Sequence, residues 1–386
     1  MPTRSGWGLL MAGAALVVAG RVLGPLEFYV AGSVAIAAVT LAVLIRWTRP
    51  SSVTIVREVS PGRVPVGEAT RIDLHISNRT GRRSPVLRVN DAISGTRGVR
   101  LSIAPIPSGA TTRGAYRLPT TRRGVLDIGP MRVEDADGLG LARRTHRVPS
   151  FARLLVHPPV ETLPIARVPA GDDRLLGDEL RCSLGSSNEE FDGLREYVAG
   201  DDPRRIHWPS TARHDELLVR QYRPPRHGRL TVVIDTRPPG DDDAGLDRTT
   251  SVAASVAAAV LQGGDAVRIQ TTDGRSTPVL LGSSHLEDVL EFVAILQGGA
   301  AHIDPAVPSS DGTVVVVTSD PGVVHDRTRA ALALRLRATL VISCDILRWS
   351  PDRPGESGTT GDWIHLTGPG QLGALWRLPS AARVPA

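Results

Sequence analysis

The stretch "RLTVVIDT" (229–236) combines an apolar run with a terminal acid, and it decides the fold of the C-terminal half of the chain. An Ala-rich helix is expected next, in "RTTSVAASVAAAVLQ" (248–262), followed by a second strand in "DAVRIQTT" (265–272). Strands that alternate with helices of this length are typical of a mostly parallel, doubly wound sheet. We therefore expect an α/β domain over residues 229–386.

The alternation continues toward the C-terminus. Further strands are expected in "TPVLLG" (277–282), "GTVVVVTSD" (312–320), "TLVISCD" (339–345) and "DWIHLT" (362–367). Helices are expected over 283–296, with a capping box from Ser284 to Glu287, and over 325–338. Ligands of such sheets bind beyond the carboxyl ends of the strands, so polar residues at those ends are the first candidates for a site.

Two strand ends carry such residues, Asp235 at one and Thr318 with Asp320 at the other. Asp235 resembles the first acid of the metal-ion-dependent adhesion site of von Willebrand factor type A domains, whose D-x-S-x-S motif supplies hard oxygen ligands. Arg237 and Pro239 stand here in place of the two serines. We therefore expect a degenerate site that holds no cation, and a divalent-cation-dependent binding protein is the alternative.

The middle of the chain, residues 51–160, reads as short alternating runs separated by Gly, Pro, Asn and Ser. Runs such as "VTIVREV" and "RIDLHISN" have the period of two that half-buried strands show. We expect an antiparallel, immunoglobulin-like β-sandwich there. Asn78 lies in a formal glycosylation sequon, N-R-T, and the "GLG" of residues 138–140 reads as a bend between strands.

The N-terminal 50 residues predict a transmembrane helical hairpin. Residues 6–20 and 28–45 are free of charge and flank a Gly-Pro turn, and a span needs about 20 apolar residues. A cleaved signal peptide is the alternative. Arginines cluster outside both helices, at Arg4 and from Arg46 onward, so the positive-inside rule puts the soluble domains in the cytoplasm. The expected location is the cytoplasmic membrane, as a multi-pass protein.

Composition divides the chain into differently charged parts. All 45 basic residues of the 386-residue chain are Arg. Residues 51–160 hold 18 Arg against 8 acidic residues, whereas residues 161–386 hold 23 against 31. The basic part is suited to face anionic lipid or its acidic neighbour; nucleic acid is not expected, because no aromatic stripe accompanies the arginines. The two cysteines, Cys182 and Cys344, form no disulfide framework.

The most distinctive stretch is "EEFDGLREYVAGDDPRRIHWPSTARHDELLVRQY" (189–222). It resembles the signature of the family called domain of unknown function 58. The matching positions are Phe191, Gly193, Leu194, Arg195, Glu196, Tyr197, Gly200, Asp201, Arg205, Ile206, Trp208, Ala212, Arg213, Leu218 and Val219. The resemblance implies a membrane-anchored protein with a type A-like domain that works beside a MoxR-type AAA+ ATPase. It brings no catalytic residues and no cofactor.

Residues 161–228, which contain this signature, read as a charged linker or clamp between the two soluble domains. Asp202 is expected to cap a short helix that starts at Pro203 and ends before Pro209. The expected apolar anchors are Phe191, Tyr197, Ile206 and Trp208. The expected ion pairs join Arg195, Arg205 and Arg213 to Glu196, Asp201 or Asp215. The alternative is that the stretch forms a functional surface for a partner.

Catalysis in this stretch is the less favoured reading. A hydrolase would combine Ser210 with His207 or His214 and Asp201, but no nucleophile elbow surrounds the serine. Cys182 with His207 and Asp215 lacks any local signature, and His207 with His214 lacks a third zinc ligand. We therefore expect a membrane-anchored, non-enzymatic adaptor, with a hydrolase-like enzyme that uses the acidic strand ends as the alternative.

Overall fold

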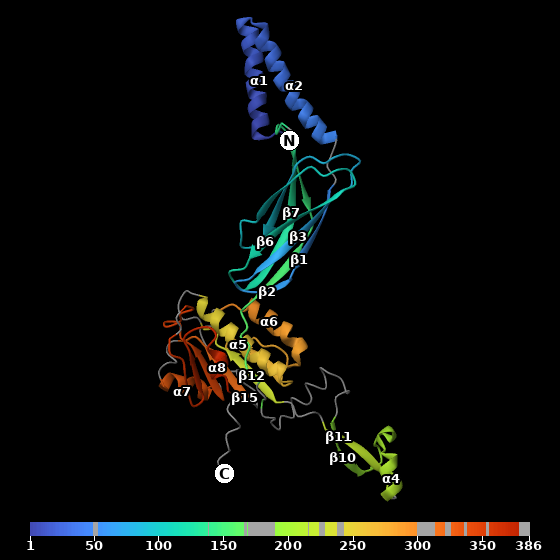
Figure 1. The fold of residues 1–386 in the computed structure, drawn as a ribbon, viewed down its shortest axis with the longest axis vertical. Helices are drawn as coiled ribbons and strands as arrows, with labels where there is room; N and C mark the ends of the chain where they lie inside the picture. Colours follow the sequence, from blue (N-terminus) through green and yellow to red (C-terminus); the bar gives the residue numbers. More distant parts are fainter. Residues whose placement is uncertain are drawn as a thin grey trace. The chain divides into compact units, whose positions relative to one another are not determined.

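The computed structural model describes residues 1–48, 53–137, 139–165, 168, 190–214, 216–223, 228–237, 243–298, 313–320, 326–335, 338–352 and 355–377. The chain divides into two compact units, residues 1–157 and 158–386 (Figure 1). Two apolar N-terminal helices and several sheets confirm the mixed α and β architecture that the sequence predicts.

The N-terminal helices α1 (Arg4–Leu23) and α2 (Leu26–Thr48) form a tight hairpin. Gly13 and Gly32 lie where the helices touch, because a Cβ on Gly32 would come within 2.6 Å of the Gly13 carbonyl oxygen. Small residues at such a contact let two helices approach closely, as they do in membranes. Gly24 ends α1 in the left-handed conformation, with φ of 94°. Both helices are long and apolar enough to cross a bilayer.

A β-sandwich follows the hairpin in the first unit. One sheet has the order β1-β3-β6 and the other β2-β9-β7-β4-β5, with β8 paired to β7. Alternate residues of β3, Ile72, Leu74 and Ile76, are fully buried and share one core with residues of the second sheet. The strands are β1 (Val53–Ser60), β2 (Arg63–Pro65), β3 (Ala69–Asn78), β4 (Leu87–Ile93), β5 (Val99–Ile103), β6 (Thr111–Pro119), β7 (Gly124–Ala136), β8 (Arg143–Val148) and β9 (Ala152–His157).

The second unit is built on a seven-stranded sheet of order β14-β13-β12-β15-β16-β18-β17. The five inner strands are parallel, and the two edge strands are antiparallel to their neighbours. The strands are β12 (Arg229–Ile234), β13 (Ala266–Thr271), β14 (Leu280–Leu281), β15 (Thr313–Thr318), β16 (Leu340–Cys344), β17 (Gly358–Thr360) and β18 (Trp363–Leu366). The helices are α5 (Ala244–Gln262), α6 (Leu286–Ile295), α7 (Asp326–Arg335) and α8 (Leu372–Leu375).

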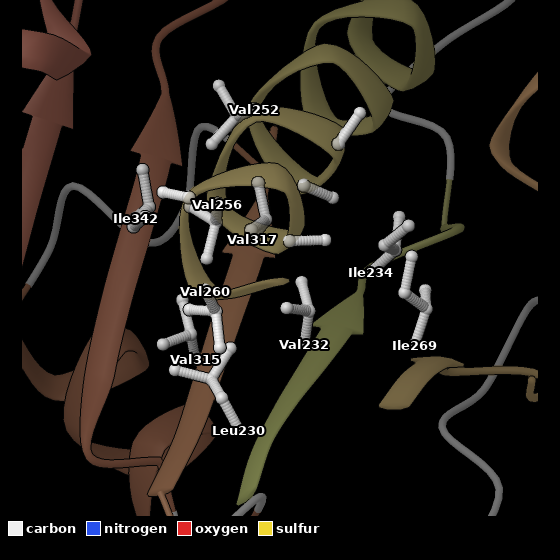
Figure 2. Close-up of a cluster of buried hydrophobic side chains, with 14 of the residues drawn as sticks. Leu230, Val232, Ile234, Val252, Val256, Val260, Ile269, Val315, Val317 and Ile342 are labelled. Carbon is white, nitrogen blue, oxygen red and sulfur yellow. The ribbon is translucent and has the colours of Figure 1, made fainter. Parts of the chain in front are cut away.

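Helices cover both faces of this sheet. On one face, Val252, Val256 and Val260 of α5 pack against Val232 and Val315 of the central strands (Figure 2). On the other face, alternate residues of the same strands pack against α7. Because the inner strands are buried on both sides, they read as unbroken apolar runs in the sequence.

The predicted element boundaries need correction in this unit, and the strand expected over 277–282 is shortened to β14, Leu280–Leu281. The helix expected from residue 248 starts four residues earlier, at Ala244. The capping box from Ser284 to Glu287 is wrong, because a 3-10 turn over Ser283–His285 precedes α6 and the residue before α6 makes no side-chain cap.

The stretch that stands out in the sequence for its charged and aromatic residues forms a small module of its own within the second unit. Two antiparallel strands, β10 (Glu190–Glu196) and β11 (Leu218–Arg223), flank the 3-10 turn η1 (Pro203–Arg205) and the short helix α4 (Trp208–His214). We call these residues, 190–223, the signature module. Asp202 caps η1 as predicted, since its side chain accepts the Arg204 amide hydrogen.

Candidate functional site

The carboxyl ends of β12 and β15 meet at the centre of the seven-stranded sheet. From β12 the chain moves to β13 on one side, and from β15 it moves to β16 on the other. In parallel α/β sheets this change of direction opens the crevice where ligands bind. Asp235 follows β12 and Thr318 ends β15, so two of the residues predicted from the sequence lie together here.

Asp235 is almost fully buried and both of its carboxylate oxygens are occupied. Arg237 donates from Nε to Oδ1 at 2.8 Å and from NH2 to Oδ2 at 2.6 Å. Thr318 donates its hydroxyl to Oδ2 at 2.8 Å. Asp320 lies farther out, with a carboxylate oxygen 3.7 Å from the Arg237 guanidinium. Two of the three predicted residues, Asp235 and Asp320, therefore face Arg237, and Thr318 contacts Asp235.

This arrangement does not fit a divalent cation. The Arg237 guanidinium places a positive charge where an ion would share the Asp235 carboxylate, and its hydrogen bond to Asp235 raises the pKa of Arg237 above its ordinary value. Within the described residues no group of three or more His, Cys, Asp or Glu side chains is placed to hold a metal. Pro239 and residues 240–242 of the acidic loop lie outside the described residues.

Two threonines that follow β12 and β13, Thr236 and Thr272, complete the site, and sequence reasoning missed them. Thr272 follows β13, and its hydroxyl lies 3.0 Å from that of Thr236 and accepts the Thr236 amide hydrogen at 3.0 Å. Both threonines are buried. The signal was available, because the strand "DAVRIQTT" was expected beside "RLTVVIDT" and both end in hydroxyl or carboxylate side chains.

An Asp-x-Arg pair recurs at the end of the neighbouring strand. Arg275 folds back onto Asp273 just as Arg237 folds onto Asp235, and it also donates to the Gln297 carbonyl at 2.8 Å. The Asp273 side chain is 25% exposed, whereas that of Asp235 is 1% exposed. The two pairs therefore have the same spacing and differ in burial.

In the signature module, Arg195 and Asp201 form the predicted two-pronged ion pair. Both guanidinium nitrogens lie 2.6 Å from a carboxylate oxygen, and the Val198 amide donates to the same carboxylate at 3.0 Å. The Arg195 hydrogen bond, with that of Val198, lowers the pKa of Asp201 to about 2. Gly200, with φ of 116°, permits the turn between them.

Backbone bonds tie the rest of the module to β11. Ile206 bridges to Val219, and the His207 amide donates to the Leu218 carbonyl at 2.8 Å. The Leu218 amide in turn donates to the Thr211 hydroxyl at 3.1 Å. The Tyr197 amide bonds to the Leu217 carbonyl at 2.8 Å. The signature residues thus build a fixed platform from β10 to β11.

The predicted burial of Trp208 is wrong. Trp208 is 63% exposed. Three apolar residues of the module are exposed as well: Val198 (62%), Leu217 (45%) and Leu194 (37%). Pro209 also lies inside the first turn of α4 and does not end the preceding turn. The side chain of Phe191, another expected anchor, lies outside the described residues. An aromatic residue in a charged stretch can be a buried anchor or an exposed contact residue. Trp208 is an exposed residue in the structure.

Of the catalytic alternatives, the structure describes one pair of residues, His207 and Ser210, and leaves the others outside the described residues. His207 Nδ1 lies 2.8 Å from the Ser210 hydroxyl, but Asp201, the acid expected beside them, is bonded to Arg195 and Val198. Cys182, Asp215 and the side chain of His214 lie outside the described residues, so the hypotheses that use them stay predictions. Cys344 is buried, and burial raises the pKa of its thiol to about 12.

Glu196, Arg205 and Arg213 are exposed on the module, and the predicted pairing of an arginine with Asp215 lies outside the described residues. Residues 193–348 match the family described as "Protein of unknown function DUF58". The uncharacterized protein YeaD of Bacillus subtilis (strain 168) is 25% identical over 203 residues, 51% of this chain and 47% of its own length. Both comparisons support the DUF58 assignment. The chain spans about half the length of this curated relative.

Solved structures resemble only part of the chain. The CARDB domain of PF1109 from Pyrococcus furiosus is 14% identical, covers 28% of this chain and 88% of its own, and has a TM-score of 0.22. The putative ApaA protein of Bordetella pertussis is 12% identical, covers 27% and 92%, and has a TM-score of 0.20. TM-scores this low carry no argument about fold or function.

Proposed function

We propose that this DUF58 protein is a membrane-anchored, non-enzymatic adaptor that binds a protein partner through its signature module. The observation that carries the proposal is the exposure of Trp208 on a platform fixed by backbone bonds and by the Arg195–Asp201 pair. Tryptophan is among the residues that dominate binding energy at protein interfaces. A contact side chain on a rigid support also loses little conformational entropy on binding.

Exposed apolar neighbours extend this contact beyond one residue. Val198 belongs to the turn held by Asp201, and Leu217 directly precedes β11. Charged residues of the same module, Arg204, Arg205 and Glu196, are exposed as well, as in the polar rim of an interface. The module therefore offers a small apolar centre with a charged rim.

The α/β domain supports a binding role over catalysis. The order β14-β13-β12-β15-β16-β18, with an antiparallel first strand, favours a doubly wound, von Willebrand type A-like fold. Asp235 is the acid that such a domain would offer to a cation, and Arg237 occupies it. An internal arginine in that position makes cation-dependent adhesion or hydrolysis the less favoured alternative.

The family resemblance supplies the kind of partner, a MoxR-type AAA+ ATPase. Such a partner needs ATP, which agrees with soluble domains on the cytoplasmic side of the membrane. The arginines at the start of α1 and from the last turn of α2 onward point the same way. A reporter that is active only outside the cytoplasm, fused after Ala386, is expected to stay silent, and strong activity would overturn this orientation.

Capture of a MoxR-type ATPase encoded beside the protein tests the adaptor role. Full-length wild type and Trp208→Ala are compared in detergent, with Phe151→Ala as the control because Phe151 is an aromatic residue in the other unit that is at least as exposed, at 71%. We expect Trp208→Ala to weaken capture about 30-fold, as loss of an interface hot spot does. The free energy of unfolding should change by about 0.5 kcal/mol at most, as for other surface substitutions. Capture that is equal in all three proteins would contradict the proposal.

A further inference from the structure

Backbone hydrogen bonds join one end of the β-sandwich to the residues at the start of the helical hairpin. The Thr3 amide donates to the Leu141 carbonyl and the Arg143 amide donates to the Met1 carbonyl, each at 2.9 Å. Leu141 and Ala142, which are buried, form one apolar cluster with Val39 and Ala42 of α2. The loop between β7 and β8 therefore lies against the hairpin, near the first turn of α1.

Strand register places a second loop at the same end. Val53 at the start of β1 pairs with Asn78 at the end of β3, and Leu87 at the start of β4 pairs with Asp135 near the end of β7. The β3–β4 loop, residues 79–86, therefore leaves and re-enters the sandwich on the hairpin side.

These two loops expose arginines and apolar side chains together. Leu139 is 76% exposed and Val86 is 48% exposed. We call the following exposed residues the hairpin-proximal rim: Arg79, Arg82, Arg83, Val86, Leu139 and Arg143. Two exposed tryptophans lie at the helix ends that adjoin the sandwich, Trp7 in the first turn of α1 and Trp47 in the last turn of α2. Exposed apolar side chains, arginines and tryptophans that occur together are typical of the part of a membrane protein that lies at the bilayer interface.

The rim carries unbalanced positive charge. Among the described residues, none of its four guanidinium groups is placed within ion-pair distance of a carboxylate. In the β7–β8 loop, Asp137 accepts the amides of Leu139 and Ala142 at 3.2 and 2.6 Å, and Asp135 of β7 is buried. The charge of the rim is therefore available to an external anion.

The β3–β4 loop is rigid because Asn78 organises it from within. The Asn78 amide group donates to the Arg82 and Ile106 carbonyls at 2.7 and 3.0 Å. Its oxygen accepts from the Thr80 amide and hydroxyl at 3.1 and 2.7 Å. Asn78 is only 2% exposed, so the residue of the formal sequon is a structural one. It holds the loop so that its arginines are presented on a fixed backbone.

We propose that the hairpin-proximal rim binds the headgroups of anionic phospholipids, with Leu139 and Val86 entering the interfacial layer of the bilayer. The inference rests on the proposed membrane anchorage. Guanidinium groups match phosphate oxygens in a two-pronged geometry, and basic residues beside a span are drawn to anionic lipid. The rim fixes the sandwich against the membrane surface at a point separate from the helices.

Native mass spectrometry of the full-length protein in neutral detergent tests this inference, by counting bound lipids as phosphatidylglycerol or phosphatidylcholine is titrated in. The test variant is Arg82→Glu with Arg83→Glu. The control, Arg97→Glu with Arg117→Glu, makes the same change of charge at exposed positions toward the opposite end of the sandwich. We expect the test variant to lose about tenfold or more in preference for phosphatidylglycerol, and the control to keep it.

Equal loss in both variants, or loss in neither, would overturn the inference. An alkaline wash of membranes separates that failure from failure of the anchor. If the wild type stays in the membrane and the two variants bind lipid alike, only the proposed lipid binding by the rim is refuted. If the wild type is washed off the membrane, both the membrane anchor and the lipid binding are refuted. Should the charge reversal prevent folding, Arg82→Gln with Arg83→Gln decides in the same assay, because neither change touches the Asn78 bonds.

Discussion

Two arginine–aspartate pairs, one in the sandwich and one in the signature module, have the same chemistry in opposite surroundings. The side chains of Arg57 and Asp91 are 1% and 0% exposed, and those of Arg195 and Asp201 are 43% and 20% exposed. Both arginines contact a carboxylate directly and a backbone carbonyl as well. The difference teaches that burial decides whether such a pair holds a core together or only shapes a surface turn.

The buried pair links strands of both sheets. Arg57 of β1 bonds to Asp91 of β4 and donates to the carbonyls of Ile128 and Ser150 at 2.8 and 2.9 Å. Tyr116 of β6 donates to the other Asp91 oxygen at 2.7 Å. Burial, together with this bond, raises the pKa of Tyr116 well above its ordinary value, so the phenol stays protonated. Both oxygens of the Asp91 carboxylate are thus bonded, one to Arg57 and the other to Tyr116.

The largest expected effect is therefore in the sandwich. Asp91→Ala leaves the Arg57 guanidinium buried without its carboxylate, and should lower the free energy of unfolding by about 3–5 kcal/mol. Amide hydrogen exchange of Ile72 and Leu74 in the full-length protein measures this, since both lie in the sandwich core.

Two further variants sharpen that result. Arg88→Ala, at an exposed position of the same strand, should change the free energy by about 0.5 kcal/mol at most. Arg57→Met combined with Asp91→Leu should recover part of the loss, because no charge is then left alone in the core. A cost of Asp91→Ala below about 1 kcal/mol would mean that water reaches the pair, against the burial of its side chains.

A third pair, Asp235 with Arg237, is intermediate, with side chains 1% and 28% exposed. Arg237→Ser should cost about 1–3 kcal/mol, because a buried carboxylate loses charged hydrogen bonds. It also restores one serine of the adhesion-site motif, so millimolar Mg²⁺ should raise the melting temperature of this variant and leave that of wild type unchanged.

The neighbouring Asp273–Arg275 pair supplies the control. Arg275→Ser removes an arginine of identical spacing from a more exposed aspartate, and should show no response to Mg²⁺ in the same melting experiment. Stabilisation of wild type by Mg²⁺, lost in Asp235→Ala, would show that the strand-end site holds a cation despite Arg237.

The sequence predicts the α/β sheet well because burial on both faces leaves a clear pattern. The strands β12, β15 and β16 are apolar almost throughout, and helices separate them along the chain. Helix starts are predicted less well, since Ser284 satisfies the capping pattern while the chain forms a 3-10 turn there. Which turn forms depends on the preceding Gly282, whose φ of 86° the residue pattern does not reveal.

For the candidate site, the sequence predicts which residues lie at the strand ends, but it does not predict which of them contact one another. The spacing Asp-x-Arg shows that Arg237 replaces a serine, but only the structure shows the guanidinium folded onto both oxygens of Asp235. Trp208 was expected inside because aromatic side chains usually are buried. Its exposure follows from the fixed path of η1 and α4 along β11, which is a tertiary property.

The smallest effect is expected for the exposed pair, where the readout is a pKa. Asp201 has a folded-state pKa of about 2, below its ordinary 3.8, chiefly because of the Arg195 hydrogen bond. A lowered pKa stabilises the folded module at pH values above about 4, and this contribution is lost as the pH falls from about 4 toward 2. Arg195→Gln should raise the pKa of Asp201 toward 3.8, as followed by NMR titration of its carboxylate carbon. Arg204→Gln removes the same charge from a nearby exposed position and should leave the pKa at about 2. If Asp201 of the wild type titrates near 3.8, the pair does not form in solution, and the turn that carries Val198 is held by its backbone bonds alone.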